Sequence, residues 1–146
     1  MRLVPAQFAV ALAVVCAACG ASSDARRDGQ VAYDGRTLEE WWPRRRDADD
    51  ATASQARTAI RMMGAAAVPF LANKAASHDL GDNIGGSVAL EDLCPNALPA
   101  MEAARANHPS AALEAAIRRV RADAADRVRD GTCGASGAPV RPESRR

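Results

Sequence analysis

The feature that most constrains the fold is an internal repeat of apolar residues. A shift of thirty positions places Ala67-Val68-Pro69-Phe70-Leu71 over Ala97-Leu98-Pro99-Ala100-Met101. The same shift superimposes further pairs: Ala59 on Ala89, Ile60 on Leu90, and Met63 on Leu93. Repetition at a fixed period is typical of arrays in which each helical hairpin buries its apolar face against a neighbour. We therefore expect at least two stacked helical hairpins.

Local signals predict where the helices begin and end. Thr37 and Glu40 have the spacing of a capping box, which predicts a helix from Leu38 that Pro43 should shorten. Helical spacing over 51–63 and about 66–77, with Gly64 between, predicts an antiparallel hairpin. A further helix is predicted over about 109–128, ended by Asp130-Gly131. The stretch 77–87 is interpreted as a long connecting loop.

Two segments resemble bacterial HEAT-like (armadillo-type) repeat proteins. Asp34 to Trp41 resembles the opening motif of that family, and Gly64 to Leu71 resembles its turn between helices. The resemblance implies an all-α fold, a short right-handed stack of antiparallel helical hairpins or α-solenoid fragment, here over 33–130. The sequence departs from the family pattern at Pro43, and at Cys94-Pro95, where the second repeat should carry its glycine turn.

The N-terminus carries the pattern of an export signal. Arg2 precedes an apolar stretch from Leu3 to Ala18 that is short for a membrane span, so 1–18 is predicted to be a signal peptide. The segment Val15 to Gly20 resembles the bacterial lipoprotein signal, which implies that Cys19 is acylated, although Cys16 occupies the usual aliphatic position. The alternative is ordinary cleavage after the apolar stretch, which would release a secreted protein.

The segments on either side of the helical region are polar. The stretch 19–32 contains the lipidated cysteine and no apolar periodicity, so we expect a flexible linker. The stretch 131–146 mixes Gly, Ser, Pro and Arg and is predicted to be a disordered tail. Cys94 and Cys133 can form a disulfide outside the cytoplasm, worth about 3 to 4 kcal/mol. Alternatively, Cys94 is a buried small hydrophobe and Cys133 is free in the tail.

Trp41, Trp42 and Arg45 form the predicted protein interface. Successive residues on a helix are about 100° apart, so one tryptophan can cover the apolar end of the stack while the other faces solvent or a partner. The alternative is that both tryptophans cover the open end of the first hairpin and the nearby arginines are a solvated face.

Several function classes are disfavoured. Nineteen basic residues against eighteen acidic ones give no basic excess, so no nucleic-acid partner is expected. His78, Asp79 and Asp82, even with His108 and Cys94, lack the spacing of metal ligands. No metal or cofactor is therefore expected, and no Ser or Cys nucleophile is paired with a histidine. The chain is predicted to be non-enzymatic.

The predicted function is that of a lipid-anchored protein-binding scaffold of the bacterial cell envelope, with another envelope protein as its partner. Gly20, rather than an aspartate, follows the anchor, which resembles lipoproteins sent to an outer membrane in cells that have one. One alternative is a soluble periplasmic or secreted domain with a small-ligand or enzymatic role through the His78 to Asp82 loop. Another is a diverged remnant of a longer repeat protein.

Overall fold

A short β-hairpin opens the fold. In the computed structural model, which describes residues 31–141, β1 (Ala32–Tyr33) pairs antiparallel with β2 (Arg36–Thr37). Asp34 and Gly35 form the turn with φ values of 49° and 71°, the sign that a tight hairpin turn requires at both central positions. Leu38 N donates to Val31 O at 3.1 Å. The predicted flexible linker over 19–32 therefore ends too late. Val31 and Ala32 belong to the fold, because they are bound to Leu38 and Thr37.

The predicted capping box is confirmed at α1 (Leu38–Trp41). Thr37 N donates to Glu40 Oε2 at 2.7 Å, and Glu40 N donates to Thr37 Oγ1 at 3.4 Å. Pro43 ends this helix early, as expected, because the chain tightens into the 3-10 helix η1 (Pro43–Arg46).

The predicted helix over 51–63 is confirmed as α2 (Asp50–Met63). Asp49 is its N-cap and accepts a hydrogen bond from Thr52 N at 2.9 Å. The helix ends at Gly64, whose φ is +56°. Its buried face consists of small and apolar side chains: Ala53, Ala56, Ala59, Ile60 and Met63.

The repeated segments adopt the same succession of elements. After α2 come the 3-10 helix η2 (Gly64–Ala67) and α3 (Val68–Ala75); after α4 (Leu80–Glu91) come the 3-10 helix η3 (Pro95–Ala97) and α5 (Leu98–Asn107). Equivalent positions are buried in both copies, as the pairs Ile60 and Leu90, or Leu71 and Met101, show. The predicted loop over 77–87 is wrong, because α4 occupies most of it.

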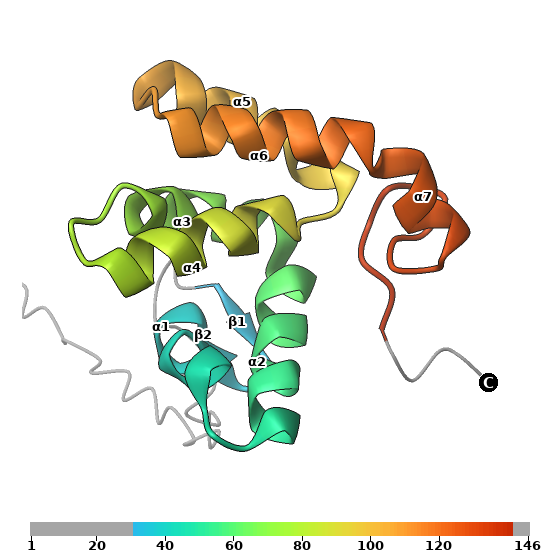
Figure 1. Cartoon of the computed structure of the whole chain (residues 1–146). Coiled ribbons are helices and arrows are strands. Elements are labelled where there is room, and N and C mark those ends of the chain that lie inside the picture. Colours follow the sequence, from blue (N-terminus) through green and yellow to red (C-terminus); the bar gives the residue numbers. More distant parts are fainter. Residues whose placement is uncertain (1–30, 142–146) are drawn as a thin grey trace, which may run out of the picture.

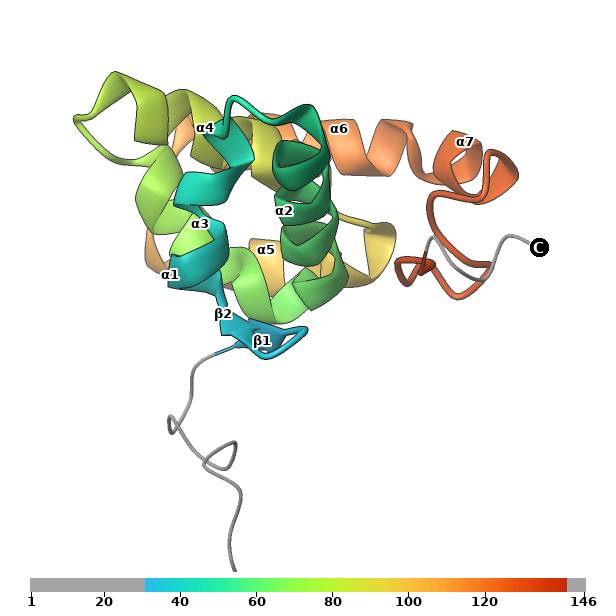
Figure 2. The same ribbon diagram turned by 90° about the horizontal axis from the view of Figure 1, so that it is seen from below.

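The helices pack as pairs in successive layers. α3 packs chiefly on α4, α5 packs on α6 (Ala111–Ala122), and α4 contacts α6 between the two layers (Figure 1). α2 stands steeply to α4 and packs on η1 and β1 below them, and Figure 2 shows this lower layer from beneath. The sequence predicted an antiparallel hairpin of the two helices on either side of Gly64, which are α2 and α3. In the structure, α3 instead packs mainly against α4.

A glycine explains why α3 and α4 approach so closely. A Cβ atom built on Gly86 would lie 2.7 Å from the carbonyl carbon of Lys74 and would also overlap Ala75 N. Backbone atoms cannot move aside as a flexible side chain can, so any larger residue would force the helices apart. Gly86 therefore sets the spacing of this pair.

The C-terminal part differs from the prediction in two ways. The single helix expected over 109–128 is broken at Asp123 into α6 and α7 (Ala124–Arg129). The prediction of a disordered tail over 131–146 is wrong for residues 131–141. There Cys133 and Pro139 form an isolated antiparallel β-bridge, and Asn96 N donates to Gly137 O at 3.1 Å. These contacts and a disulfide tie the segment to the helices and offset the entropy of ordering it.

Residues 1–30 and 142–146 lie outside the described part of the chain. The predicted signal peptide, the acylated Cys19 and most of the linker fall there. Among residues 31–141, no helix has both the length and the apolar character needed to cross a membrane.

Candidate functional site

The two tryptophans are structural. Trp41 is fully buried and Trp42 is 5% exposed, so the prediction that one of them faces solvent or a partner is wrong. Trp41 Nε1 donates to Tyr33 O at 2.9 Å, and the Trp42 ring packs edge-on against Phe70. Both rings belong to the buried hydrophobic core, so neither is an exposed interface residue, in agreement with the alternative interpretation on this point.

Arg45 also lies inside the fold, with a side chain only 9% exposed. Its guanidinium carbon stacks 3.4 Å from the Trp42 ring centroid, and its nitrogens donate to Trp42 O at 2.7 Å and Gly81 O at 3.2 Å. Burial and the neighbouring Arg46 lower its pKa, while Asp82 opposes that effect. Arg45 therefore joins η1 to α4 and is not a free interface residue.

Asp82 is the acceptor at the centre of this network. It accepts hydrogen bonds from Lys74 Nζ at 2.7 Å and Trp42 Nε1 at 2.9 Å, and it pairs with Arg45 at 3.7 Å and Arg46 at 3.8 Å. The hydrogen bond from Lys74, followed by that from Trp42, lowers the pKa of its carboxyl group. Asp82 therefore holds η1, α3 and α4 together.

The segment from His78 to Asp82 is not the loop that the sequence suggested. Asp79 is the N-cap of α4 and accepts a hydrogen bond from Asp82 N at 2.7 Å. His78 is exposed, and across residues 31–141 no three side chains of the metal-binding types cluster. The alternative function assigned a small-ligand or enzymatic role to this segment as a loop, whereas in the structure the segment begins α4.

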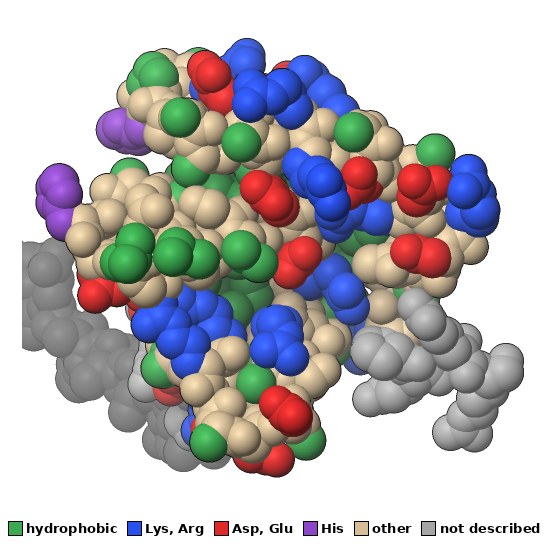
Figure 3. Space-filling model, in the orientation of Figure 1, with side chains coloured by type: hydrophobic (Ala, Val, Ile, Leu, Met, Phe, Trp, Pro, Cys, Tyr) green, Lys and Arg blue, Asp and Glu red, His purple; other side chains and the backbone are tan. Residues whose placement is uncertain are grey.

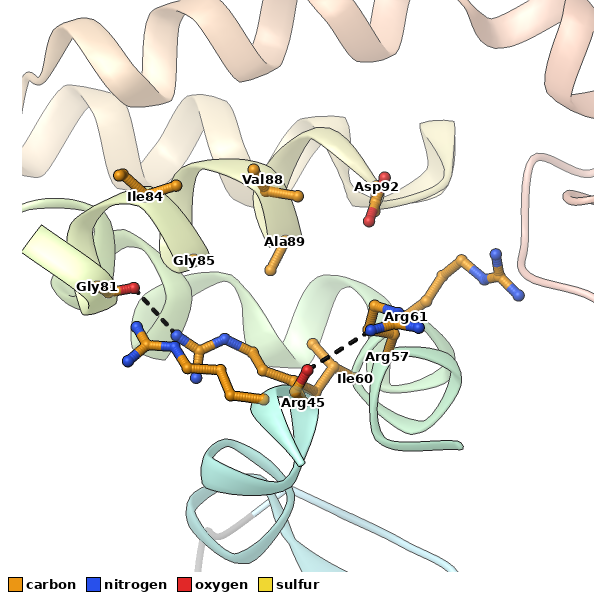
Figure 4. A pocket seen from close by; sticks show the side chains of 11 residues that line it. Arg45, Arg57, Ile60, Arg61, Gly81, Ile84, Gly85, Val88, Ala89 and Asp92 are labelled. Atoms are coloured by element: carbon orange, nitrogen blue, oxygen red, sulfur yellow. Dashed lines mark hydrogen bonds between the residues drawn. The ribbon is translucent and has the colours of Figure 1, made fainter. Parts of the chain in front are cut away.

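A groove separates α4 from η1 and α2 (Figure 4). It encloses about 330 Å³. Its apolar side chains come from both walls and are Ile60, Ile84, Val88 and Ala89. Its charged side chains are Arg45, Arg46, Arg57, Arg61 and Asp92. The groove can therefore bury apolar groups while placing positive charge beside them.

An exposed apolar row lies along the same edge of α4. Leu80, Ile84 and Val88 are 72%, 54% and 51% exposed. Their spacing of four residues puts them on one face of the helix, and Figure 3 shows hydrophobic side chains there directly above a basic patch. Leu90, by contrast, is fully buried on the core side. No contact among the described residues buries this row of apolar side chains.

Two arginines of the groove, Arg57 and Arg61, form no ion pair within residues 31–141, although the carboxylate of Asp92 is near enough to feel their charge. Arg57 makes a single hydrogen bond, of 3.5 Å, to Arg45 O, and Arg61 Nε is buried without an acceptor. Asp92 also lines the groove, and the residue as a whole is exposed. Burial of its carboxyl group nevertheless raises the pKa of that group, and this effect outweighs the attraction of Arg127, Arg61 and Arg57. The groove therefore has a positive surplus.

A second hollow lies between α3 and α5, with a volume of about 850 Å³. Alanines make up half of its lining residues, and Asn73, Asn107, His108 and Ser110 supply polar groups. Within the described part of the chain, no charged cluster lines it and no exposed row of large apolar side chains lies beside it.

The structure brings Cys94 and Cys133 together in a disulfide, with sulfur atoms 2.04 Å apart and Cα atoms 5.9 Å apart. Both residues are buried. Arg127 fixes the same region, because it donates to Glu91 O at 2.6 Å and Leu93 O at 3.4 Å at the end of α4. Neither cysteine of the disulfide lines the groove, so the disulfide has a structural role.

The sequence interpretation missed Ile84, Val88, Arg57 and Arg61. The spacing of Leu80, Ile84 and Val88 was a visible signal for one helix face, but three glycines in the same stretch favoured a loop. Comparisons with protein-family models, curated proteins and solved structures gave no match.

Proposed function

We propose that the chain is a lipid-anchored, non-enzymatic helical-repeat protein of the bacterial cell envelope that binds another protein through the groove beside α4. The observation that carries this proposal is the exposed row of Leu80, Ile84 and Val88 above four arginines. Apolar side chains gathered along a groove and bordered by charge are the usual composition of a binding surface.

The packing of α4 supports a binding role for its outer face. α4 packs against α3 and α6, and Gly86 and Leu90 are its buried residues, so these contacts already hold the helix in place. The outer row adds nothing to that core. Covering it with a partner would remove apolar surface from water, worth roughly 25 cal/mol per Å² before the costs of association.

The layered helix pairs support the HEAT-like part of the proposal. The pair α3 and α4 and the pair α5 and α6 are consecutive, and they stack through α4 and α6. Proteins built in this way commonly present a helix surface to their partners. We propose that this chain is a short right-handed stack of such pairs, related to the HEAT-like repeat proteins.

The anchor is proposed from the sequence around Cys19. It is tested by the intact mass of the native protein extracted from membranes with detergent, together with its N-terminal peptide. We expect a chain beginning at Cys19 that carries a diacylglycerol and an amide-linked acyl chain. An unacylated chain beginning near Gly20 would contradict the anchor and favour a diffusible periplasmic or secreted protein.

The binding role is tested separately by purifying the full-length protein from chemically cross-linked envelopes. The variant for comparison is Ile84→Ser/Val88→Ser, in which both changed side chains are exposed and the fold should remain intact. We expect at least one protein to accompany the wild type and to be lost from the variant at equal recovery. Identical sets of proteins with both would contradict a binding role for this face.

A further inference from the structure

We propose that the segment seated in the groove is an amphipathic α-helix of the partner, with apolar side chains on the α4 row and aspartate or glutamate side chains facing Arg57 and Arg61. This inference rests on the proposed protein-binding role and specifies its partner.

The shape of the site favours a helix as the occupant. Leu80, Ile84 and Val88 form a straight row about 12 Å long, because eight residues of helix rise 1.5 Å each. A partner helix laid along this row would match it with side chains three and four residues apart, as in other complexes of a helix in a groove. The groove beside the row is open, and its floor includes Ile60 and Ala89.

The charges favour an acidic partner. Arg57 and Arg61 are four residues apart on α2, so both lie on the same face, and within residues 31–141 neither forms an ion pair. Arg45 and Arg46 already pair with Asp82. Arg61 Nε is buried without an acceptor, and a carboxylate in the groove would bring acceptor oxygens close to this guanidinium. A basic helix would instead meet like charges.

The placement of the charges favours a helix over a lipid surface. The arginines lie on η1 and α2, across a hollow from the exposed row on α4 (Figure 4). A single helix can contact both walls with different faces, whereas a membrane contacts the outermost side chains of a flat or convex surface. We therefore assign the site to a protein helix and treat anionic lipid as the competing result of the test.

The test measures binding of labelled peptides to the full-length protein in phosphatidylcholine nanodiscs. The first probe is a peptide of roughly 20 residues with leucines three and four apart and glutamates along one flank. The second has the same composition in scrambled order, and the third replaces every glutamate by lysine. Binding of phosphatidylglycerol vesicles is measured in parallel.

The protein variants separate charge from apolar contact. Arg57→Gln/Arg61→Gln should weaken binding of the acidic peptide about tenfold, while Asp92→Asn should strengthen it about threefold. The matched control is Arg105→Gln/Arg118→Gln, which removes two exposed arginines of α5 and α6 and should leave the affinity unchanged. Ile84→Ser/Val88→Ser, with its two exposed positions, should also weaken binding about tenfold. Circular dichroism of each variant checks the fold.

Binding of the amphipathic acidic peptide alone, with these changes in affinity, would support the inference. Equal binding of the scrambled peptide, stronger binding of the lysine peptide, binding of the vesicles in place of the peptides, or no binding would each overturn it. The cross-linking comparison in envelopes distinguishes the two failures: a partner still lost with Ile84→Ser/Val88→Ser would keep the protein-binding role and exclude only the acidic helix.

Discussion

Trp42 Nε1 donates a 2.9 Å hydrogen bond to Asp82 Oδ1 across forty positions of sequence. This bond connects the last turn before η1 to the first turn of α4, and Lys74 and Arg45 bind the same carboxylate. It therefore fixes the wall that carries the arginines against the wall that carries the exposed apolar row.

The ionised form of Asp82 is expected to stabilise the fold. Because the pKa of Asp82 is lower in the folded chain, its contribution is present above the unfolded value of about 4 and is lost as the pH falls through the folded value. Asp82→Asn should lower the free energy of unfolding at neutral pH and flatten its fall in acid. Urea unfolding at a series of pH values tests this. A residual slope is expected from Asp49, whose pKa is also lowered, and parallel curves for both proteins would contradict the prediction.

Gly86→Ala should destabilise the protein by about 1 to 3 kcal/mol, because the added methyl group meets the backbone of α3. The matched control is Gly81→Ala, five residues earlier in the same helix. Its methyl group meets the guanidinium of Arg46, whose Cζ would lie 2.7 Å away and whose side chain is half exposed and can move. Denaturant unfolding should show a large loss for Gly86→Ala and a small change for Gly81→Ala; equal losses would refute the role assigned to Gly86.

Removal of the disulfide with Cys94→Ala/Cys133→Ala should lower the free energy of unfolding by about 3 to 4 kcal/mol, since the bond closes a loop with a sequence separation of 39 residues. A reductant should destabilise the wild type by a similar amount and leave the variant unchanged. If the wild type unfolds identically with and without reductant, the bond does not contribute to stability. Faster proteolysis within 131–141 of the variant would further indicate that the bond holds this segment.

Predictions from the sequence succeeded where the signals were local. The capping box at Thr37 and the ends of α2 depend on neighbouring residues, so spacing alone located them. Four of the recurring pairs also proved to be buried in both copies, namely Ile60 and Leu90, Met63 and Leu93, Ala67 and Ala97, and Leu71 and Met101. These features required no knowledge of which helices meet in space.

Predictions failed where distant residues determine the structure. The glycines of α4 resemble a loop in sequence, yet Gly86 is required by the close approach of α3, and Gly81 and Gly85 make room for Arg46 and Arg45. The order of 131–141 depends on Cys94 and Asn96, which are far away in sequence. The burial of Trp42 likewise depends on Phe70 and Asp82. The groove could not be foreseen because its two walls come from separate segments.

The most direct test of the account is site-specific photo-cross-linking in intact cells. A photoreactive residue replaces Ile84 on the exposed row of α4 or, as a control, Ala106 on the exposed surface of α5. The account predicts a discrete protein adduct from position 84 that is absent from position 106 and is lost with Arg57→Gln/Arg61→Gln. Equal adducts from both positions, or none from position 84, would contradict the claim that this groove is where the protein meets its partner.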